Sequence, residues 1–277
     1  MRRYPLAAAA AALPGLIGTT APATAAVVLP DFTAAVFVPG APIDNAYLPL
    51  VPGTRSQLFG QGEDDGETFT ERTRLKVLGP GPTILGVRAT TVLDQAYEDG
   101  LLVEKTRDYF AQDTAGNVWY LGEDVTNYHY DDEGVLIGTD SASAWRAGVN
   151  GALPGFAMPL STTIGLQYYQ EFAEADEALD IGTTFAILDE LEVSGITYHN
   201  VLQVFETNPF EPDSREFKYY APGVGIIRTD EGLDASLANP ELVMTRVAAP
   251  IPLPAGAWLL GAGLLSLLGL RRGSRRG

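Results

Sequence analysis

Apolar and polar residues alternate over short stretches between residues 31 and 245, and turn-forming residues separate these stretches. An alternation with a period of two is typical of half-buried β-strands, whereas no long stretch repeats its apolar residues with the 3.6-residue period of a helix. Several separating segments combine acidic residues with glycine, as in Glu98-Asp99-Gly100 and Asp131-Asp132-Glu133-Gly134. Because Asp-Gly is a strong hairpin signal, the pattern predicts neighbouring antiparallel strands.

About ten strands are predicted in a single run, without a sequence repeat that would indicate a propeller or a solenoid. They cover residues 56–60, 68–78, 83–97, 101–112, 118–130, 135–145, 166–172, 179–191, 196–207, 215–221 and 224–229. Residues 146–163 are rich in glycine and proline and are interpreted as a crossover or a lid, and residues 171–179 could instead form a helical turn. The predicted fold class is mainly β, with a single curved antiparallel sheet arranged as a half-open barrel or a sandwich.

The N-terminus departs from the strand pattern. Arg2 and Arg3 precede an alanine-rich apolar stretch, and small residues follow it. This order is typical of a secretory signal peptide, and Ala23-Thr24-Ala25 matches the small-residue pattern that precedes a cleavage site. The sequence predicts a signal peptide over residues 1–25 with cleavage before Ala26. Ala21-Pro22-Ala23 is the second choice, and an uncleaved anchor is the alternative.

The C-terminus carries a second apolar stretch, residues 254–270, which contains no charged residue. As a helix rising about 1.5 Å per residue, it would extend roughly 25 Å. A hydrocarbon core of about 30 Å can thin to meet such a helix, or flanking arginines can snorkel. Arg271, Arg272, Arg275 and Arg276 follow the stretch, and the positive-inside rule places them in the cytoplasm. The pattern predicts a transmembrane helix with the acidic part of the chain on the outer side of the membrane.

A proline motif, Ile251-Pro252-Leu253-Pro254-Ala255, opens this stretch, and Gly256-Ala257-Trp258-Leu259-Leu260 continues it. The arrangement resembles the PEP-CTERM class of sorting tails in its VPLPA variant, with Ile251 in place of the usual valine. The resemblance implies that an exosortase-type protease of the membrane cleaves near the motif and passes the protein to the cell surface or the exopolysaccharide matrix. An ordinary C-terminal anchor is the alternative. Prolines favour processing, because they keep the segment before the helix extended and accessible.

These assignments divide the chain into four parts. They are a signal peptide (1–25), a β domain (26–232), a linker (233–250) and a sorting tail (251–277) with its helix at 254–270. Four phrases of the β domain also resemble an uncharacterised secreted bacterial domain. They are Asn45-Ala46-Tyr47-Leu48-Pro49-Leu50-Val51-Pro52-Gly53-Thr54, Gly116-Asn117-Val118-Trp119-Tyr120-Leu121-Gly122-Glu123, Trp145-Arg146-Ala147-Gly148 and Tyr219-Tyr220-Ala221-Pro222-Gly223-Val224-Gly225. This resemblance implies one domain and gives no catalytic residue.

Charge is distributed unevenly along the 277 residues. The chain has 35 acidic and 18 basic residues and a formal net charge of −17, and every acidic residue lies between Asp31 and Glu241. An acidic domain of this kind disfavours nucleic-acid partners. The chain also has no cysteine, which excludes a disulfide framework, a thiol nucleophile and a lipidated N-terminus. Any attachment to a membrane therefore depends on the apolar segments.

Catalytic chemistry finds little support in the sequence. His129 and His199 lie in predicted strands, and the chain has no Gly-x-Ser-x-Gly or His-Glu-x-x-His motif, so both are interpreted as ordinary strand residues. Among 35 acidic residues, some pair will have the separation of a glycosidase pair by chance. Calcium is the more serious metal candidate, but the acidic turn residues do not match the EF-hand spacing. These are Asp64, Asp65, Glu98, Asp99, Asp131, Asp132 and Glu133. The sequence predicts a protein that is not an enzyme and holds no cofactor or metal.

Ten aromatic residues could line a cleft for a glycan or a lipid-like ligand, although packing on strands explains most of them. They are Trp119, Tyr120, Tyr128, Tyr130, Trp145, Tyr168, Tyr169, Phe172, Tyr219 and Tyr220. The predicted function is a non-catalytic surface or matrix protein that is structural or associated with exopolysaccharide. The alternatives are a carrier that binds an apolar ligand in a half-open barrel, and an extracellular hydrolase. An apolar pocket would favour the carrier, and a cleft joining a histidine to a carboxylate and a serine would favour the hydrolase. A filled core would favour the matrix protein.

Overall fold

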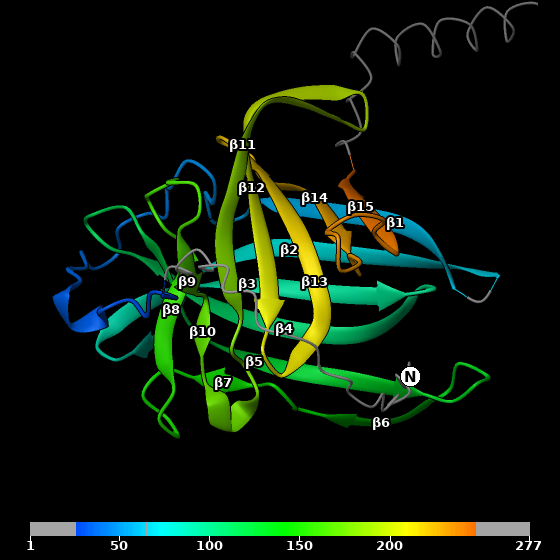
Figure 1. Cartoon of the computed structure of the whole chain (residues 1–277). Helices are drawn as coiled ribbons and strands as arrows, with labels where there is room; N and C mark the ends of the chain where they lie inside the picture. The colour runs from blue at the N-terminus through cyan, green and yellow to red at the C-terminus, as the bar shows by residue number, and fades with distance from the viewer. Residues whose placement is uncertain (1–25, 65, 248–277) are drawn as a thin grey trace, which may run out of the picture. The chain divides into compact units, whose positions relative to one another are not determined.

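The computed structural model describes residues 26–64 and 66–247, which form an almost entirely β structure (Figure 1). The first ten strands are β1 (Arg55–Asp64), β2 (Glu67–Ile84), β3 (Val87–Glu98), β4 (Leu101–Gln112), β5 (Val118–Tyr130), β6 (Leu136–Asp140), β7 (Trp145–Arg146), β8 (Leu153–Met158), β9 (Gln167–Tyr169) and β10 (Glu171–Phe172). The others are β11 (Ile181–Val193), β12 (Ile196–Asn208), β13 (Glu211–Ala221), β14 (Gly225–Glu231) and β15 (Leu242–Arg246). Two single-turn 3-10 helices, at Phe32–Ala34 and Glu174–Asp176, are the helices of this region.

All strands belong to one antiparallel sheet in the order β10-β8-β5-β4-β3-β2-β1-β15-β14-β13-β12-β11-β9, with β6 and β7 also paired to β5. The two strands at the ends of this order, β9 and β10, are separated in the chain by Gln170 alone. A Cβ at Gly155 of β8 would lie 2.3 Å from the Gln170 carbonyl oxygen, so the two edges meet closely. The sheet is therefore a nearly closed barrel, and the predicted single curved antiparallel sheet is confirmed.

The hairpin turns follow local chemistry. Asp99 and Gly100 have φ angles of 47° and 87°, the left-handed conformation that a two-residue hairpin turn requires. The same turn occurs at Leu85 and Gly86, with φ angles of 46° and 82°. This turn divides the predicted strand 83–97, because leucine at a left-handed position gives no turn signal in the sequence. Between β3 and β14, the other reversals of the chain lie in segments that the sequence predicts to be turns or connections.

Part of the expected linker, residues 233–250, is a strand. Within it, β15 pairs with both β1 and β14, and Leu242 and Met244 are buried. A five-residue strand close to Pro240 and Pro250 has too few alternating positions to be recognised by its pattern. The glycine-rich segment 146–163 likewise contains β8, which pairs with β5.

The signal peptide (1–25), the sorting motif and the helix at 254–270 lie outside the described residues. Within residues 26–64 and 66–247, no helix combines the length and the apolar character needed to cross a bilayer.

Much of the apolar core lies on the outer face of the barrel. Trp119 points outwards from β5 and packs against Phe32 and Phe37 of the N-terminal segment, with ring centroids 5.2 and 6.2 Å away. A second outer cluster forms on β12, β13 and β14 around residues such as Val201 and Ile227. Because these clusters lie outside the sheet, they stabilise the strands without filling the interior of the barrel.

Candidate ligand-binding cavity

A cavity of about 1140 Å³ lies inside the barrel. Its wall is formed by residues of eleven strands, β1 to β5, β8, β10 and β12 to β15, together with the segment before β1. Pockets that enclose small molecules usually measure about 300–1,000 Å³, so the interior is large enough for a ligand of that class. The barrel is therefore not a filled core.

The cavity changes from acidic to apolar along the barrel. On β4 the inward residues are Glu104, Thr106, Asp108 and Phe110, in that order. Its neighbours follow the same gradient, because β2 presents Thr73, Leu75 and Val77, and Val77 is opposite Val92 of β3. Across the barrel, β13 presents Glu216, Lys218 and Tyr220, which face Glu231, Thr229 and Ile226 of β14. One end of the cavity is thus acidic and the other is apolar.

The segment 43–54 closes the apolar end. Leu48, Leu50 and Val51 of this segment line the cavity. Asn45 holds the segment in place, because its amide Nδ2 donates to the carbonyl of Gly116 at 2.9 Å while its Oδ1 accepts two backbone amides of the segment. Gly223 N donates to the Ala46 carbonyl at 2.7 Å. Three of the four phrases that resemble the secreted domain thus meet at this end.

The acidic end opens into a second, smaller cavity of about 290 Å³. The two cavities share Glu123, Glu171, Asp180, Glu206 and Glu216 in their linings, so they adjoin. Glu177 and Glu211 extend the acidic lining of the smaller cavity outwards. A ligand that entered by this route would pass carboxyl groups before it reached the apolar end.

On one wall, Tyr120 of β5 joins two carboxyl groups. Its hydroxyl oxygen lies 2.7 Å from Asp108 Oδ1 and 2.8 Å from Glu123 Oε2. A phenol has one proton to donate, so both contacts are hydrogen bonds only when one of the carboxyls carries a proton. Burial raises the pKa of Asp108 to about 7 and that of Glu123 to about 8. The three groups therefore hold a shared proton near neutral pH.

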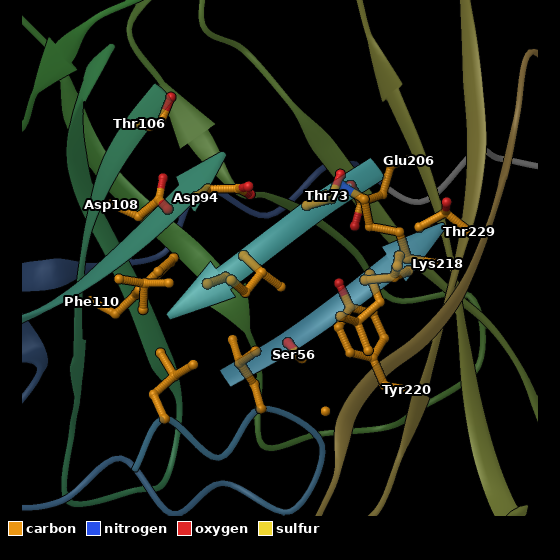
Figure 2. Close-up of a pocket in the computed structure, with 18 of the residues that line it drawn as sticks. Ser56, Thr73, Asp94, Thr106, Asp108, Phe110, Glu206, Lys218, Tyr220 and Thr229 are labelled. Carbon is orange, nitrogen blue, oxygen red and sulfur yellow. The ribbon is translucent and has the colours of Figure 1, made fainter. Parts of the chain in front are cut away.

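On the opposite wall, Lys218 is the centre of an ion-pair cluster (Figure 2). Its Nζ lies 2.6 Å from Glu206 Oε2 and 3.0 Å from Glu216 Oε1. Glu206 accepts a further hydrogen bond from Gln170 Nε2 at 3.0 Å. Burial raises the pKa of Glu216 to about 7, although Lys218 acts against this effect. The charge of Lys218 is therefore already engaged by two glutamates.

Two buried oxygen atoms of the lining have no hydrogen-bond partner among the described residues. They are Asp94 Oδ1 and Gln170 Oε1, and both are acceptors. Asp94 lies on β3 beside Asp108 and Thr106, across the cavity from Lys218 (Figure 2). Burial, and then the neighbouring Asp108 and Glu104, raise the pKa of Asp94. The cavity therefore offers acceptors that protein donors do not satisfy.

The structure keeps both histidines away from this cavity. His129 Nε2 lies 2.6 Å from Asp140 Oδ2 at an exposed position on β5 and β6, and His199 is exposed on β12 opposite Glu190. Hydrogen bonds from Asn127, Ala142 and His129 lower the pKa of Asp140 to about 2. In the described region, no serine hydroxyl is hydrogen-bonded to either histidine.

The acidic turn residues have local roles where their side chains are described. Asp99 accepts hydrogen bonds from Thr70, and Asp131 accepts the backbone amide of Val135 within its own turn. In the described part of the chain, no three His, Asp or Glu side chains gather closely enough to share a metal ion.

Two of the ten aromatic residues considered from the sequence line the cavity. Tyr120 and Tyr220 point inwards, and Trp145 packs edge-on against Tyr120 with ring centroids 5.4 Å apart, whereas Trp119 and Tyr219 belong to outward-facing clusters. The interior acids were not predicted as a site. Their signal is the alternation of charge along a strand, as in Glu104-Lys105-Thr106-Arg107-Asp108, which separates acids and bases onto opposite faces.

The outer face of β1, β2 and β4 is correspondingly basic. It carries Arg72, Arg74, Lys76, Lys105 and Arg107, which alternate with inward residues on their strands, and Arg55, which also lines the cavity at the start of β1. The register brings the set together, since Lys76 pairs with Arg55 on β1, and Arg74 is connected through Gln95 of β3 to Lys105. Arg74 also lies over the ring of Tyr97, 4.9 Å from its centroid. We call these six residues the basic face.

No family model matches the chain, and no curated protein matches it. Among solved structures, it is similar to a predicted exported protein with a YmcC-like fold from Bacteroides fragilis, with 10% identity over 73% of this chain and 97% of that chain and a TM-score of 0.37. It is also similar to a predicted lipoprotein from Parabacteroides distasonis (12% identity, 73% and 98% coverage, TM-score 0.32). A DUF1329 family protein from Desulfovibrio piger gives 13% identity, 72% and 86% coverage and a TM-score of 0.25. None of these likenesses carries an argument about the function of this chain.

Proposed function

We propose that the protein is an exported, non-catalytic carrier that holds an amphipathic ligand inside its barrel. The observation that carries this proposal is the cavity of about 1140 Å³ whose closed end is apolar. Transferring an alkyl chain from water into such a space is favourable by about 0.8 kcal/mol for each buried CH₂ group. A structural matrix protein has no need for an interior of this kind, so the cavity favours the carrier among the functions that the sequence left open.

The side chains of the cavity give little support to a hydrolase. A carboxyl pair that performs acid–base catalysis needs environments that separate the two pKa values, so that one group is ionised while the other is protonated. Burial instead raises the pKa of Asp108, Glu123, Asp180 and Glu216 together. These groups therefore form a polar lining of similar acidity, and not a pair in which one group is the acid and the other the base.

The two ends of the chain support the rest of the proposal. The signal-peptide pattern of residues 1–25 favours export, and the resemblance of residues 251–277 to a sorting tail favours transient anchoring in the inner membrane and processing by an exosortase-type protease. The basic face favours contact with an anionic exopolysaccharide once the protein reaches the cell surface, because its positive charge is concentrated on neighbouring strands.

The carrier proposal is tested with an uncharged apolar fluorophore, N-phenyl-1-naphthylamine, titrated into the protein purified in its exported form. We expect saturable fluorescence enhancement that dodecanol reverses by competition. Leu75→Trp extends a side chain into the cavity and is expected to weaken binding by about tenfold, a loss of about 1.4 kcal/mol.

Leu93→Trp is the matched control, because Leu93 is on the neighbouring strand β3 and does not line the cavity. Thermal unfolding of each variant shows whether it is folded. Equal affinity of the wild-type protein and a folded Leu75→Trp variant, or no saturable binding by the wild-type protein, would reject the carrier.

A further inference from the structure

The charge of the cavity lining deepens the proposed function and rests on it. Nine carboxyl groups line the main cavity: Asp94, Glu104, Asp108, Glu123, Glu171, Asp180, Glu206, Glu216 and Glu231. Four basic side chains line it as well, namely Arg55, Arg215, Lys218 and Arg246. Withdrawing carboxylates from water is costly unless they are protonated or paired with a cation. The excess of carboxyl groups over basic side chains therefore has to be offset by protonation or by a cation.

The basic side chains leave one acidic wall uncompensated. Lys218 is bound to Glu206 and Glu216. Arg215 and Arg246 donate to backbone carbonyls, and Arg55 is exposed at the start of β1. The wall formed by Asp94, Glu104, Asp108 and Glu123 has no ion pair with a basic residue in the described structure, and its side-chain hydrogen bonds come from Thr106 and Tyr120.

The buried atoms without hydrogen-bond partners also indicate a ligand that supplies donors. Asp94 Oδ1 and Gln170 Oε1 are buried acceptors without a donor. A neutral hydroxyl ligand could satisfy one acceptor but would leave the charge of the wall uncompensated, and a carboxylate ligand would add to the excess. An alkylammonium group supplies three N–H donors and one positive charge at the same atom.

The gradient of the cavity fixes the orientation of such a ligand. The smaller acidic cavity adjoins the larger one, Val77 and Val92 lie level with Asp108, and the apolar residues Phe110 and Leu50 lie beyond the carboxyl groups. An alkyl chain placed in the apolar end would leave its head group among Asp94, Asp108 and Gln170.

We infer that the cavity binds long-chain primary ammonium compounds, with the ammonium group among Asp94, Asp108 and Gln170 and the chain at the closed apolar end. The positive head supplies the donor that Asp94 Oδ1 lacks, and it balances the acidic wall, with which Lys218 forms no ion pair. Charge-assisted hydrogen bonds are about twice as strong as neutral ones, which gives the ammonium compound its advantage over an alcohol of equal length.

The test compares dodecylamine, dodecanol and dodecanoate by isothermal titration calorimetry with the exported protein at pH 7, with the two ionic compounds below their critical micelle concentrations and dodecanol below its solubility limit. We expect dodecylamine to bind at least about tenfold more tightly than dodecanol, and dodecanoate to bind more weakly than both. Asp94→Asn preserves the shape of the side chain and is expected to remove most of this advantage while leaving dodecanol binding unchanged. Asp189→Asn, at an exposed position on β11, is the control and should change neither affinity.

The outcomes separate the two proposals. Equal binding of dodecylamine and dodecanol, or tighter binding of dodecanoate, would overturn the inference and leave the carrier intact. Failure of all three compounds to bind would reject the carrier itself. A folded Asp94→Asn variant that kept the full preference for the amine would also overturn the inference, because the advantage would then arise elsewhere.

Discussion

At the scale of single residues, the interior of the barrel shows how a fold can hold carboxyl groups that water would normally solvate. Tyr120 lies between Asp108 and Glu123, and its hydroxyl and one retained proton satisfy both groups. Such a network is stable only while each member has its partner, because an unpaired polar group in a buried site is costly. The protonation state of this cluster should therefore control the stability of the protein.

The first prediction concerns pH. In the unfolded chain, Asp108 and Glu123 ionise near pH 4, whereas burial holds their pKa values at about 7 and about 8 in the folded protein. Between these limits the folded state binds more protons, so the free energy of unfolding falls as pH rises and levels off above about pH 8. We expect Tm to be lower at pH 8.5 than at pH 5.5, by about 2–4 °C for each kcal/mol lost, in differential scanning calorimetry.

The double variant Asp108→Asn/Glu123→Gln isolates the cause of this slope. Its amides stay neutral at every pH, so Tm should change less between pH 5.5 and 8.5 than in the wild-type protein. Asp132→Asn, in an exposed turn, should keep the wild-type slope. A slope equally steep in a folded double variant would show that other groups produce it.

The sequence predicted part of this picture. Because alternation along a strand separates residues onto two faces, Glu104, Thr106 and Asp108 could be placed on one face from the sequence alone. That this face lines a cavity could not be predicted, since a surface acid and an interior acid look identical in a sequence. Tyr120 illustrates the same limit, because one of its partners, Asp108, lies on another strand next to a bulge.

At the scale of elements, most hairpins were predictable and two short strands were not. Acidic residues next to glycine marked the reversals at Asp99 and Asp131, whereas Leu85-Gly86 carried no such mark. The short strands β8 and β15 lay in segments interpreted as a crossover and a linker. Both owe their conformation to long neighbours, β5 for the first and β1 and β14 for the second.

A prediction at this scale concerns the basic face. Because Arg74 and Arg107 stand on neighbouring parts of one sheet surface, we expect salt-dependent binding of the exported protein to an anionic polysaccharide such as alginate at low ionic strength. Arg74→Glu/Arg107→Glu should weaken binding by about tenfold or more in biolayer interferometry, since two positive charges are replaced by negative ones.

The control is Arg88→Glu. Arg88 lies on β3, and the alternation of that strand places it on the face of the sheet opposite the basic face. This variant should bind as the wild-type protein does, although its net charge also changes. Equal loss in both variants would show that net charge, and not the basic face, governs binding. Binding of anionic lipid vesicles in place of the polysaccharide would reject the proposed matrix contact.

At the scale of the whole molecule, the single curved sheet was predictable because its strands follow one another with short connections. The closure of that sheet was not, since the predicted strand 166–172 is divided at Gln170 into β9 and β10, which lie at the two opposite edges of the sheet and join them. The apolar core on the outer face could not be predicted either. Both faces of β5 are buried, so alternation does not distinguish the outer face from the inner one. A chain that covers its barrel from outside can leave its interior for a ligand.

The last prediction concerns the two ends of the chain, on which the route to the ligand depends. We expect a protein tagged within its β domain to be exported with an N-terminus at Ala26 and, in cells that have the sorting protease, to lose the residues after the motif Ile251–Ala255. Mass spectrometry of the termini in fractionated cells measures both events. Cells without the protease should keep the protein in the inner membrane with Arg276 present, because the apolar stretch followed by four arginines acts as a membrane anchor until it is cut. A cytoplasmic product, or a released surface form that retains Arg276, would contradict the proposed sorting and would place the carrier cavity in a different compartment.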